Sequence, residues 1–222
     1  MKLVCFTGID GAGKTTLARN TVTALREQGE TAIYVYGRIV PMISRLAMAV
    51  GRTLLLRKHN QWHEYGAYTA DKKLTLRHPI FAWGHTATIL IDYYLQIWLK
   101  LLPHLLGRHT VVVDRYIYDT IISDLAAHLG YSLAKAEKAI HTALKLLPRP
   151  SLVILLDLPE EVAFSRKTDV PHVDYLGERR PYYLHLTTHP EIELFNGEMS
   201  QEELLQATLR KLAEHHIGVV TQ

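Results

Sequence analysis

The run LVCFTGIDGAGKTT at residues 3–16 sets the architecture of this 222-residue chain. Its first five residues (LVCFT, 3–7) are apolar, β-branched or aromatic and stop at a glycine, which is typical of a short buried strand. A helix is expected to begin near Gly13, and a second strand is expected at residues 31–36 (TAIYVY). Strand, helix and strand in this order predict a parallel sheet.

The rest of the chain continues the alternation of strands and helices. Residues 110–114 (TVVVD) and 151–157 (SLVILLD) are nearly continuous in apolar residues, as strands covered on both faces are, and residues 191–196 form a weaker fifth candidate. Helical patterns occur at about 39–57, 82–106, 117–128, 132–147, 159–167, 178–187 and 200–215. The expected fold class is α/β, a three-layer α/β/α sandwich with a five-stranded parallel sheet in one domain, residues 1–222.

The net charge and the composition indicate which kind of ligand the protein binds and in which cellular compartment it works. A formal net charge of +3 suits a cleft for small anionic molecules and falls short of a nucleic-acid-binding surface. The single cysteine, Cys5, excludes a disulfide within the chain, and no export signal is visible at its start, so we expect a cytoplasmic protein.

The apolar run 86–106 contains Asp92, Gln96 and Lys100, which favours a buried or dimer-facing helix over a membrane span. The histidines form no HExxH pattern, and we expect no structural metal.

Residues 8–15 (GIDGAGKT) match the pattern GxxxxGK(S/T) and lie between the first strand and the first helix, where a phosphate-binding loop belongs. Glycines let consecutive backbone N–H groups turn toward phosphate oxygens, and the helix N-terminus adds the positive end of its dipole. Lys14 is expected to reach the β- and γ-phosphates of ATP, and the Thr15 hydroxyl to bind Mg²⁺. This is a fold of the P-loop NTPase type, with predicted nucleotide-binding residues Gly8, Gly11, Ala12, Gly13, Lys14, Thr15 and Thr16.

An acid and an arginine supply the second half of the expected site. Asp114 ends an apolar strand, which places a carboxylate beside Mg²⁺ at the carboxyl edge of a parallel sheet; capping of the following helix is the alternative role. Arg115 follows, and its planar guanidinium can clamp an acceptor phosphate, unless it forms an ordinary surface salt bridge. Together with Lys14, these two residues predict direct in-line phosphoryl transfer.

The loop GIDGAGKTT (8–16), taken with Asp114-Arg115-Tyr116, resembles the thymidylate kinase family of P-loop nucleoside monophosphate kinases. The resemblance implies phosphorylation of a nucleoside monophosphate, dTMP by default, with ATP as donor, Mg²⁺ as cofactor and a homodimeric enzyme. It also implies that Asp10 contacts the deoxyribose 3′-hydroxyl, while Asp114 and Arg115 hold metal-bound water and the acceptor phosphate. The alternative for Asp10 is that it only tightens the loop. The expected partners are therefore small-molecule nucleotides.

A mobile lid is expected at about residues 166–180, after the fourth strand. In the thymidylate kinase family, enzymes without a basic residue inside the P-loop carry it in the lid, and the loop position here is Gly11. A solvated helix face is the alternative for this basic cluster. The loop FNGEMS (195–200) resembles the family's adenine-side loop, which makes Asn196 a candidate nucleotide contact. The candidate catalytic arginines of the lid are Arg166, Arg179 and Arg180.

The chain departs from the family pattern on the acceptor side. Where the family has an Arg-Glu-Pro-Gly-Gly run, this chain reads GRIVP (37–41), which leaves Arg38 and Arg45 as candidates for the acceptor phosphate or as ordinary surface arginines. The helix that reads thymine in the family offers no arginine here, so Tyr93 or Tyr94 is expected to stack on the base, unless both belong to the core. The polar, aperiodic segment 57–79 is expected to be irregular and to lie on this side of the cleft. A kinase for another acceptor and a catalytically silent nucleotide-binding protein remain the alternative functions.

Overall fold

The computed structural model describes residues 1–40, 74, 76–107 and 109–217. A sheet of five parallel strands forms its centre, in the order β2-β3-β1-β4-β5. Parallel neighbours cannot be joined by a tight hairpin, so each connection crosses a face of the sheet. The five predicted strands are confirmed, with the bounds β1 Lys2–Gly8, β2 Ala32–Tyr36, β3 Thr110–Asp114, β4 Leu152–Asp157 and β5 Ile192–Asn196.

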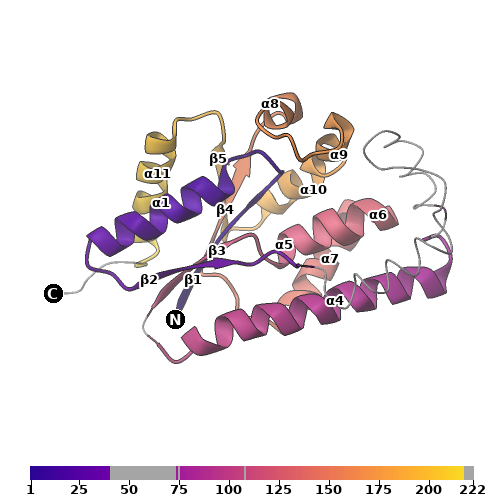
Figure 1. Ribbon diagram of the computed structural model, residues 1–222, viewed down its shortest axis with the longest axis horizontal. Coiled ribbons are helices and arrows are strands. Elements are labelled where there is room, and N and C mark those ends of the chain that lie inside the picture. The colour runs from indigo at the N-terminus through magenta and orange to yellow at the C-terminus, as the bar shows by residue number, and fades with distance from the viewer. Residues whose placement is uncertain (41–73, 75, 108, 218–222) are drawn as a thin grey trace.

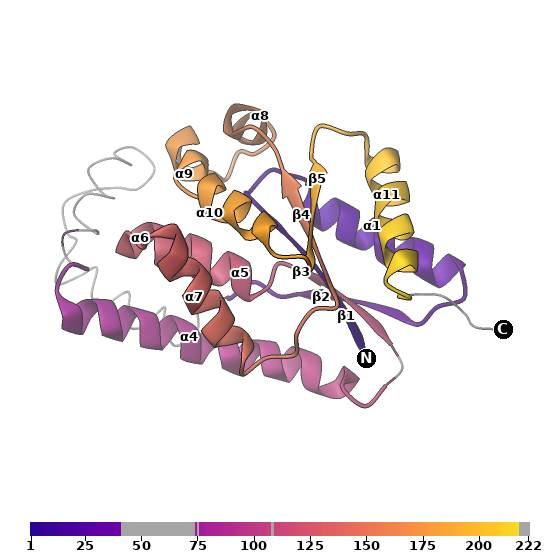
Figure 2. The same cartoon turned by 180° about the vertical axis from the view of Figure 1, so that it is seen from behind.

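Helices cover both faces of the sheet, as the sequence predicts (Figure 1). One face carries α1 (Lys14–Glu27) and α11 (Gln201–Glu214), which pack against each other. The opposite face carries the long helix α4 (Pro79–Leu101), with α5 (Ile117–Asp119) and α7 (Leu133–Leu144) beside it (Figure 2). The shorter elements are η1 Leu102–His104, η2 Thr120–Ala126, α6 Ala127–Leu129, α8 Glu160–Ser165, α9 Val173–Gly177, α10 Arg180–His185 and η3 Leu186–Thr188.

The strand register brings the two sequence motifs together. Phe6 of β1 pairs with Asp114 of β3, and Gly8 of β1 pairs with Leu156 of β4. The carboxyl ends of all the strands lie at one edge because the sheet is parallel. The loop after β1 therefore opens beside the residues that follow β3, over a core in which residues 3–6 are at most 1% exposed.

The helices differ from the prediction in two places. The single helix predicted at 117–128 is divided, because residues Thr120–Ala126 form a π-helix between α5 and α6. The predicted lid contains a helix of its own, α9. The predicted helix at 39–57, Arg45 and most of the segment 57–79 lie outside the described residues. Among the helices that the structure describes, including α4, none combines the length and the apolar character that crossing a membrane requires.

Candidate active site

The loop between β1 and α1 has a backbone that only glycines adopt readily. Gly8, Gly11 and Gly13 have φ angles of 135°, 94° and 94°. A Cβ on Gly8 would stand 2.3 Å from the carbonyl oxygen of Leu156, and a Cβ on Gly11 would stand 2.3 Å from that of Ala163. The loop is thus packed directly against the end of β4 and against α8.

Lys14 extends back into this loop. Its Nζ donates hydrogen bonds to the carbonyl oxygens of Gly8, at 2.7 Å, and Ile9, at 2.6 Å. Burial lowers the pKa of the Lys14 ammonium to about 8; the charge of Arg115 acts in the same direction, and nearby carboxylates oppose it. Two neutral carbonyls give this charge less support than a carboxylate or a phosphate would. Of the remaining loop candidates, Ala12 is buried and Thr16 is exposed.

Thr15 and Asp114, the two predicted metal ligands, are in contact. The Thr15 hydroxyl donates to Asp114 Oδ2 at 2.7 Å, and the Tyr34 hydroxyl donates to the same oxygen at 2.8 Å. Asp114 is fully buried, and its Oδ1 has no hydrogen-bond partner among the described residues. A buried carboxylate oxygen with a free lone pair is costly unless a cation or water meets it. An oxygen set of this kind suits Mg²⁺, and the arrangement therefore fits the ion.

Arg115 has a strained backbone that depends on a neighbouring glycine. Its φ is 68°, in the left-handed region, while its N–H donates to the carbonyl oxygen of Phe6 at 2.9 Å. A Cβ on Gly37 would stand only 2.1 Å from the Arg115 carbonyl oxygen. Strained residues of this kind cluster at functional sites. Gly37 belongs to the site for this reason, and the sequence did not single it out.

Asp10 and two arginines form the charged part of the site. Arg115 Nη2 lies 2.5 Å from Asp10 Oδ1, and Arg38 Nη1 lies 3.7 Å from Asp10 Oδ2. Burial alone would raise the pKa of Asp10, but the charges of Arg115, Lys14 and Arg38 outweigh it and hold the pKa well below its ordinary value. The P-loop acid is therefore a carboxylate at neutral pH, and it connects the loop to Arg115.

Asp119 is a site residue that the sequence analysis missed. It is 1% exposed and accepts hydrogen bonds from the Thr7 hydroxyl at 2.9 Å, the Tyr116 N–H at 3.2 Å and the Tyr183 hydroxyl at 3.1 Å. Its Oδ1 also lies 3.7 Å from Arg115 Nη1. Burial raises its pKa, against the lowering effect of Lys14 and Arg115. Asp119 is four residues after Arg115, but Arg115 lies before α5 with a left-handed backbone, so helical spacing alone did not predict this contact.

Arg179 of the predicted lid contacts the π-helix η2. Arg179 is 2% exposed, and its guanidinium donates to the carbonyl oxygens of Ser123, at 3.1 Å, and Tyr175, at 2.8 Å. It also stacks on the Tyr175 ring, with Cζ 3.5 Å from the centroid. Ser123 lies in the π-helix, a feature that often occurs at functional sites. Arg179 thus joins α9 to the helix that follows Arg115.

The other two lid arginines have different surroundings. Arg180 makes a two-pronged ion pair with Asp157, at 2.8 and 2.9 Å, and bonds Glu160 at 2.7 Å. Arg166 ends α8, is exposed, and donates to the carbonyl oxygen of Gly197 at 3.1 Å. Of the three arginines, Arg166 thus has the fewest fixed partners and faces the adenine-side loop.

The residues predicted to contact the base and the adenine, Tyr93, Tyr94 and Asn196, are engaged mainly in core packing or in local hydrogen bonds. Tyr93 is 1% exposed, and its ring meets the Tyr116 ring edge-on at 6.4 Å. Tyr94 is partly buried and donates to the Ala143 carbonyl oxygen at 3.1 Å. The Asn196 side chain accepts from the N–H of Glu198 at 2.9 Å, which closes its own turn. Their roles toward a nucleotide remain predictions.

The amino-acid sequence is similar to those of thymidylate kinases. No protein-family model matches the chain. It is 27% identical over 219 residues to a probable thymidylate kinase of Methanothermobacter thermautotrophicus, covering 97% of this chain and 96% of that protein. It is 26% identical over 214 residues to probable thymidylate kinase 1 of Saccharolobus solfataricus, covering 94% and 95%. A thymidylate kinase of Xylella fastidiosa is 27% identical over 223 residues, covering 96% of this chain and 90% of its own.

These relatives span nearly the whole chain at low identity, and the residues predicted for the site lie together, with Thr15 bonded to Asp114 and Arg115 paired with Asp10. The chain is therefore a divergent thymidylate kinase-like enzyme of the nucleoside monophosphate kinase class.

Proposed function

We propose that this enzyme transfers the γ-phosphoryl group of ATP to a nucleoside monophosphate, with dTMP as the principal acceptor and Mg²⁺ as the cofactor. The observation that carries the proposal is the 2.5 Å contact between Arg115 and Asp10, an ion pair that joins the P-loop to the residue after the metal acid. In the proposed roles, this pair would hold an acceptor-binding cation next to the loop that binds the donor. Direct transfer needs that proximity.

The P-loop is the proposed donor site. Lys14 would exchange the carbonyls of Gly8 and Ile9 for phosphate oxygens, which support its charge better. Thr15 and Asp114 would hold Mg²⁺, and the main support is that Asp114 Oδ1 has no hydrogen-bond partner within the described part of the chain. When bound, the nucleotide supplies the phosphoryl group and the ion offsets the phosphate charge. Tyr34 keeps Asp114 Oδ2 in place from β2.

The acceptor side is proposed to consist of Asp10, Arg115 and Arg38. Asp119 pairs with Nη1 of Arg115, and Asp10 pairs with Nη2 of the same guanidinium. The two carboxylates would therefore orient the guanidinium before the acceptor phosphate binds. Arg38 lies 3.7 Å from Asp10 and can add a second cation. Arg45 keeps its proposed role as a phosphate ligand on the sequence argument alone.

Among the lid arginines, Arg166 is the proposed catalytic residue. It ends α8, the helix whose Ala163 carbonyl lies directly against Gly11 of the P-loop. Arg180 is held by Asp157 and Glu160, and Arg179 is buried among carbonyls and Tyr175. We therefore assign Arg179 and Arg180 positioning roles in the lid.

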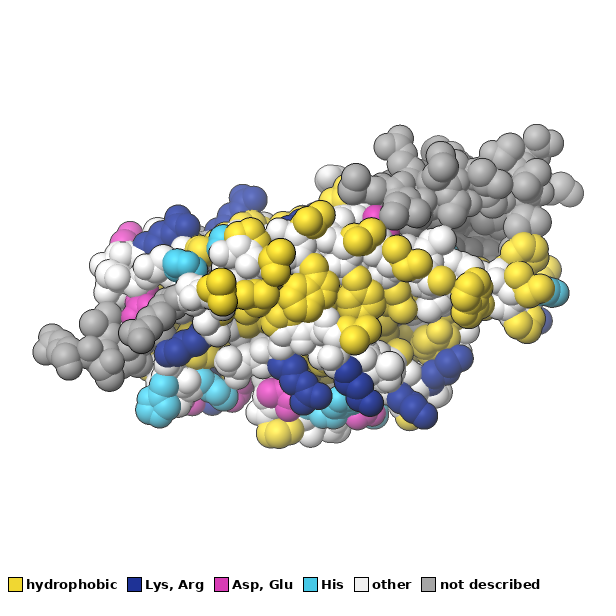
Figure 3. Space-filling model, turned by 90° about the horizontal axis from the view of Figure 1, so that it is seen from below, with side chains coloured by type: hydrophobic (Ala, Val, Ile, Leu, Met, Phe, Trp, Pro, Cys, Tyr) yellow, Lys and Arg dark blue, Asp and Glu magenta, His cyan; other side chains and the backbone are white. Residues whose placement is uncertain are grey.

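A homodimer is proposed through α4. This helix carries exposed Ile91, Leu95, Trp98 and Leu99, between 36% and 72% exposed, at a helical spacing that forms one stripe. Figure 3 shows the resulting band of apolar side chains along this face of the molecule. Monomers rarely expose a continuous apolar stripe of this kind, and a second copy would cover it.

The base preference is the least supported part of the proposal. Tyr93 is 1% exposed, and its hydroxyl has no hydrogen-bond partner among the described residues, so its ring offers a base almost no accessible surface. A kinase for another acceptor is the second candidate on this observation. The proposed setting is the cytoplasm, where the free, buried Cys5 would stay reduced.

The test is ADP formation from ATP and Mg²⁺ with dTMP, dUMP, the other nucleoside monophosphates, nucleosides and no acceptor. The fastest turnover with dTMP is expected. Equal or faster turnover with a nucleoside or a non-nucleotide phosphate would replace the acceptor assignment. Absence of ADP with every nucleoside monophosphate would overturn the proposed function.

A further inference from the structure

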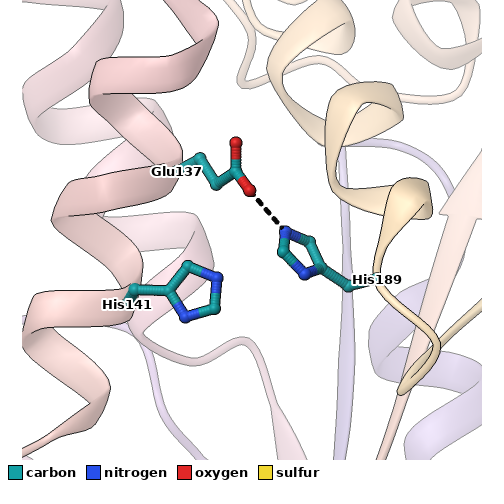
Figure 4. A group of neighbouring side chains, drawn as sticks. All are labelled: Glu137, His141 and His189. Atoms are coloured by element: carbon teal, nitrogen blue, oxygen red, sulfur yellow. Dashed lines mark hydrogen bonds and ion pairs between the residues drawn. The ribbon is translucent and has the colours of Figure 1, made fainter.

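A group of side chains that could together bind a metal ion lies near the amino end of the sheet, away from the phosphate loop. Glu137 and His141 are four residues apart on α7, so they project from one face of that helix. His189 follows η3 and lies immediately before β5. Figure 4 shows the three side chains pointing toward one another from these two segments. The group thus joins elements separated by about fifty residues of sequence.

The potential ligand atoms of the three side chains are already close enough that one metal ion could bind all of them after small side-chain rotations. One potential ligand atom from each of Glu137, His141 and His189 lies within 4.8 Å of the others. Ligands at Zn²⁺ distances on a tetrahedron stand roughly 3.4 Å apart, so small side-chain rotations suffice. His189 Nε2 already lies 2.8 Å from Glu137 Oε1, and the His141 and His189 rings are 4.9 Å apart.

A fourth group is available at the same carboxylate. His185 Nε2 lies 3.0 Å from Glu137 Oε2, so two imidazoles converge on one acid. The hydrogen bond from His185, and then that from His189, holds the pKa of Glu137 below its ordinary value. Glu137 is therefore a carboxylate at neutral pH. His185 can complete a tetrahedral site or orient Glu137 in its outer shell.

The group is separate from the proposed Mg²⁺ site. The loop before β5 lies at the amino end of the parallel sheet, whereas the P-loop follows the carboxyl end of β1. The chemistry differs too, because two or three imidazole nitrogens with one carboxylate suit Zn²⁺, whereas Mg²⁺ takes oxygen ligands. Mg²⁺ used in phosphoryl transfer would not fill it.

We propose that Glu137, His141 and His189 form a binding site for Zn²⁺ or a similar transition metal, with His185 as the fourth ligand or as an outer-shell partner of Glu137. The ion would link α7 to the segment before β5. Its role would be structural, because the site is remote from the P-loop and binding would stabilise the folded state by mass action. The proposal departs from the expectation, drawn from the sequence, that the chain has no structural metal.

The test is Zn²⁺ binding to the chelator-stripped full chain at neutral pH, measured by competition with a chromophoric chelator. One high-affinity ion per chain and a rise in Tm on adding Zn²⁺, but not Mg²⁺, are expected. Co²⁺ should give the visible absorption of a tetrahedral site containing nitrogen ligands. His141→Ala is the first variant, because His141 is exposed and its loss leaves the packing intact. Its affinity should fall at least tenfold.

The control addresses adventitious binding, since the chain has thirteen histidines. His215→Gln with His216→Gln removes a neighbouring pair at the end of α11 and should leave the affinity unchanged. Circular dichroism of each variant checks the fold. Equal Zn²⁺ affinity in the wild type and His141→Ala, or loss of binding only in the His215/His216 variant, would overturn the assignment. So would a wild-type protein that takes up no Zn²⁺ at micromolar concentration.

Discussion

Arg115 Nη2 and Asp10 Oδ1 lie 2.5 Å apart, and this ion pair connects a residue of the P-loop to a residue that follows β3. Both side chains are largely buried, with 9% and 13% of their area exposed. A pair in that setting loses much more when one member is removed than a surface pair does. It fixes the guanidinium at the place where the proposed donor and acceptor sites meet.

Replacing Asp10 with Asn should therefore weaken acceptor binding more than ATP binding. Breaking a buried ion pair by removing one charge costs up to about 3–5 kcal/mol, so the KM for the acceptor should rise by at least about tenfold. Steady-state kinetics with each substrate varied in turn measures the effect. Glu193→Gln, which breaks the surface pair with Lys211, is the matched control and should leave both KM values unchanged. A selective rise in the KM for ATP would place Asp10 on the donor side instead.

The lowered pKa of Lys14 predicts that the protein takes up protons when a nucleotide binds. Burial puts its pKa at about 8, below the ordinary value of 10.5. At pH 8.5 most Lys14 side chains are neutral in the free protein, and phosphate groups favour the ammonium, so binding should draw in a large fraction of one proton. Calorimetric titration with ADP in buffers of different ionisation enthalpy measures this number. Lys14→Arg cannot lose its proton at this pH and should show no uptake.

The lowered pKa of Lys14 also predicts how the free energy of unfolding changes with pH. Between pH 8 and 10.5 the unfolded chain holds the Lys14 proton more often than the folded chain does. The contribution of Lys14 to the free energy of unfolding should therefore increase as pH rises through this window. Lys14→Met should remove that slope in urea titrations at several pH values. An unchanged slope would mean that Lys14 keeps its proton in the folded protein.

Variants of Arg166 and Arg179 in the lid should have different phenotypes. Arg166→Ala should lower kcat by roughly 10²- to 10³-fold with little loss of stability, because the residue is exposed and is proposed to meet the transferred phosphoryl group. Arg179→Ala should mainly lower Tm, since it leaves the carbonyls of Ser123 and Tyr175 without their donor. Kinetics and thermal unfolding of both variants are the measurements. Normal kcat in Arg166→Ala would return the catalytic role to Arg180.

Much of this site follows from local sequence, because the P-loop and the strand ending in Asp114 are continuous stretches whose spacing fixes their geometry. The five strands followed from apolar runs for the same reason. Gly37 and Tyr34 did not, because each acts across the fold on Arg115 or Asp114. Asp119 did not, because its contact with Arg115 depends on the left-handed backbone that precedes α5. The π-helix and the Glu137 group likewise depend on contacts between distant segments, which no single periodicity reveals.

Self-association through α4 should be sensitive to one charge in its apolar stripe. Leu99→Glu places a carboxylate at a 72% exposed position of the stripe and should shift the protein toward the monomer. Leu194→Glu, at a 49% exposed position on the edge strand β5, is the control and should leave the association state unchanged. Sedimentation equilibrium of the wild type and both variants is the measurement. A monomeric wild type at micromolar concentration would contradict the dimer proposal.

Gly37 should tolerate no side chain, because its partner is the strained backbone of Arg115. A Cβ there would stand 2.1 Å from the Arg115 carbonyl oxygen and 2.5 Å from Val113 Cγ1, so the backbone after β3 has to move. Overpacking of this kind costs about 1–3 kcal/mol. Gly37→Ala should therefore reduce the free energy of unfolding in urea and also lower kcat/KM, since the shift displaces the guanidinium from Asp10.

Gly84→Ala is the matched control, because it makes the same substitution inside α4, where an added Cβ meets no atom of the residues that the structure describes within 4 Å. It should stabilise the protein by about 0.5–1 kcal/mol through helix propensity and leave kcat/KM unchanged. If Gly37→Ala lost stability but kept its full kcat/KM, Arg115 would not need its strained position for the reaction. A loss of kcat/KM beyond what the unfolded fraction explains would tie that strain directly to acceptor binding.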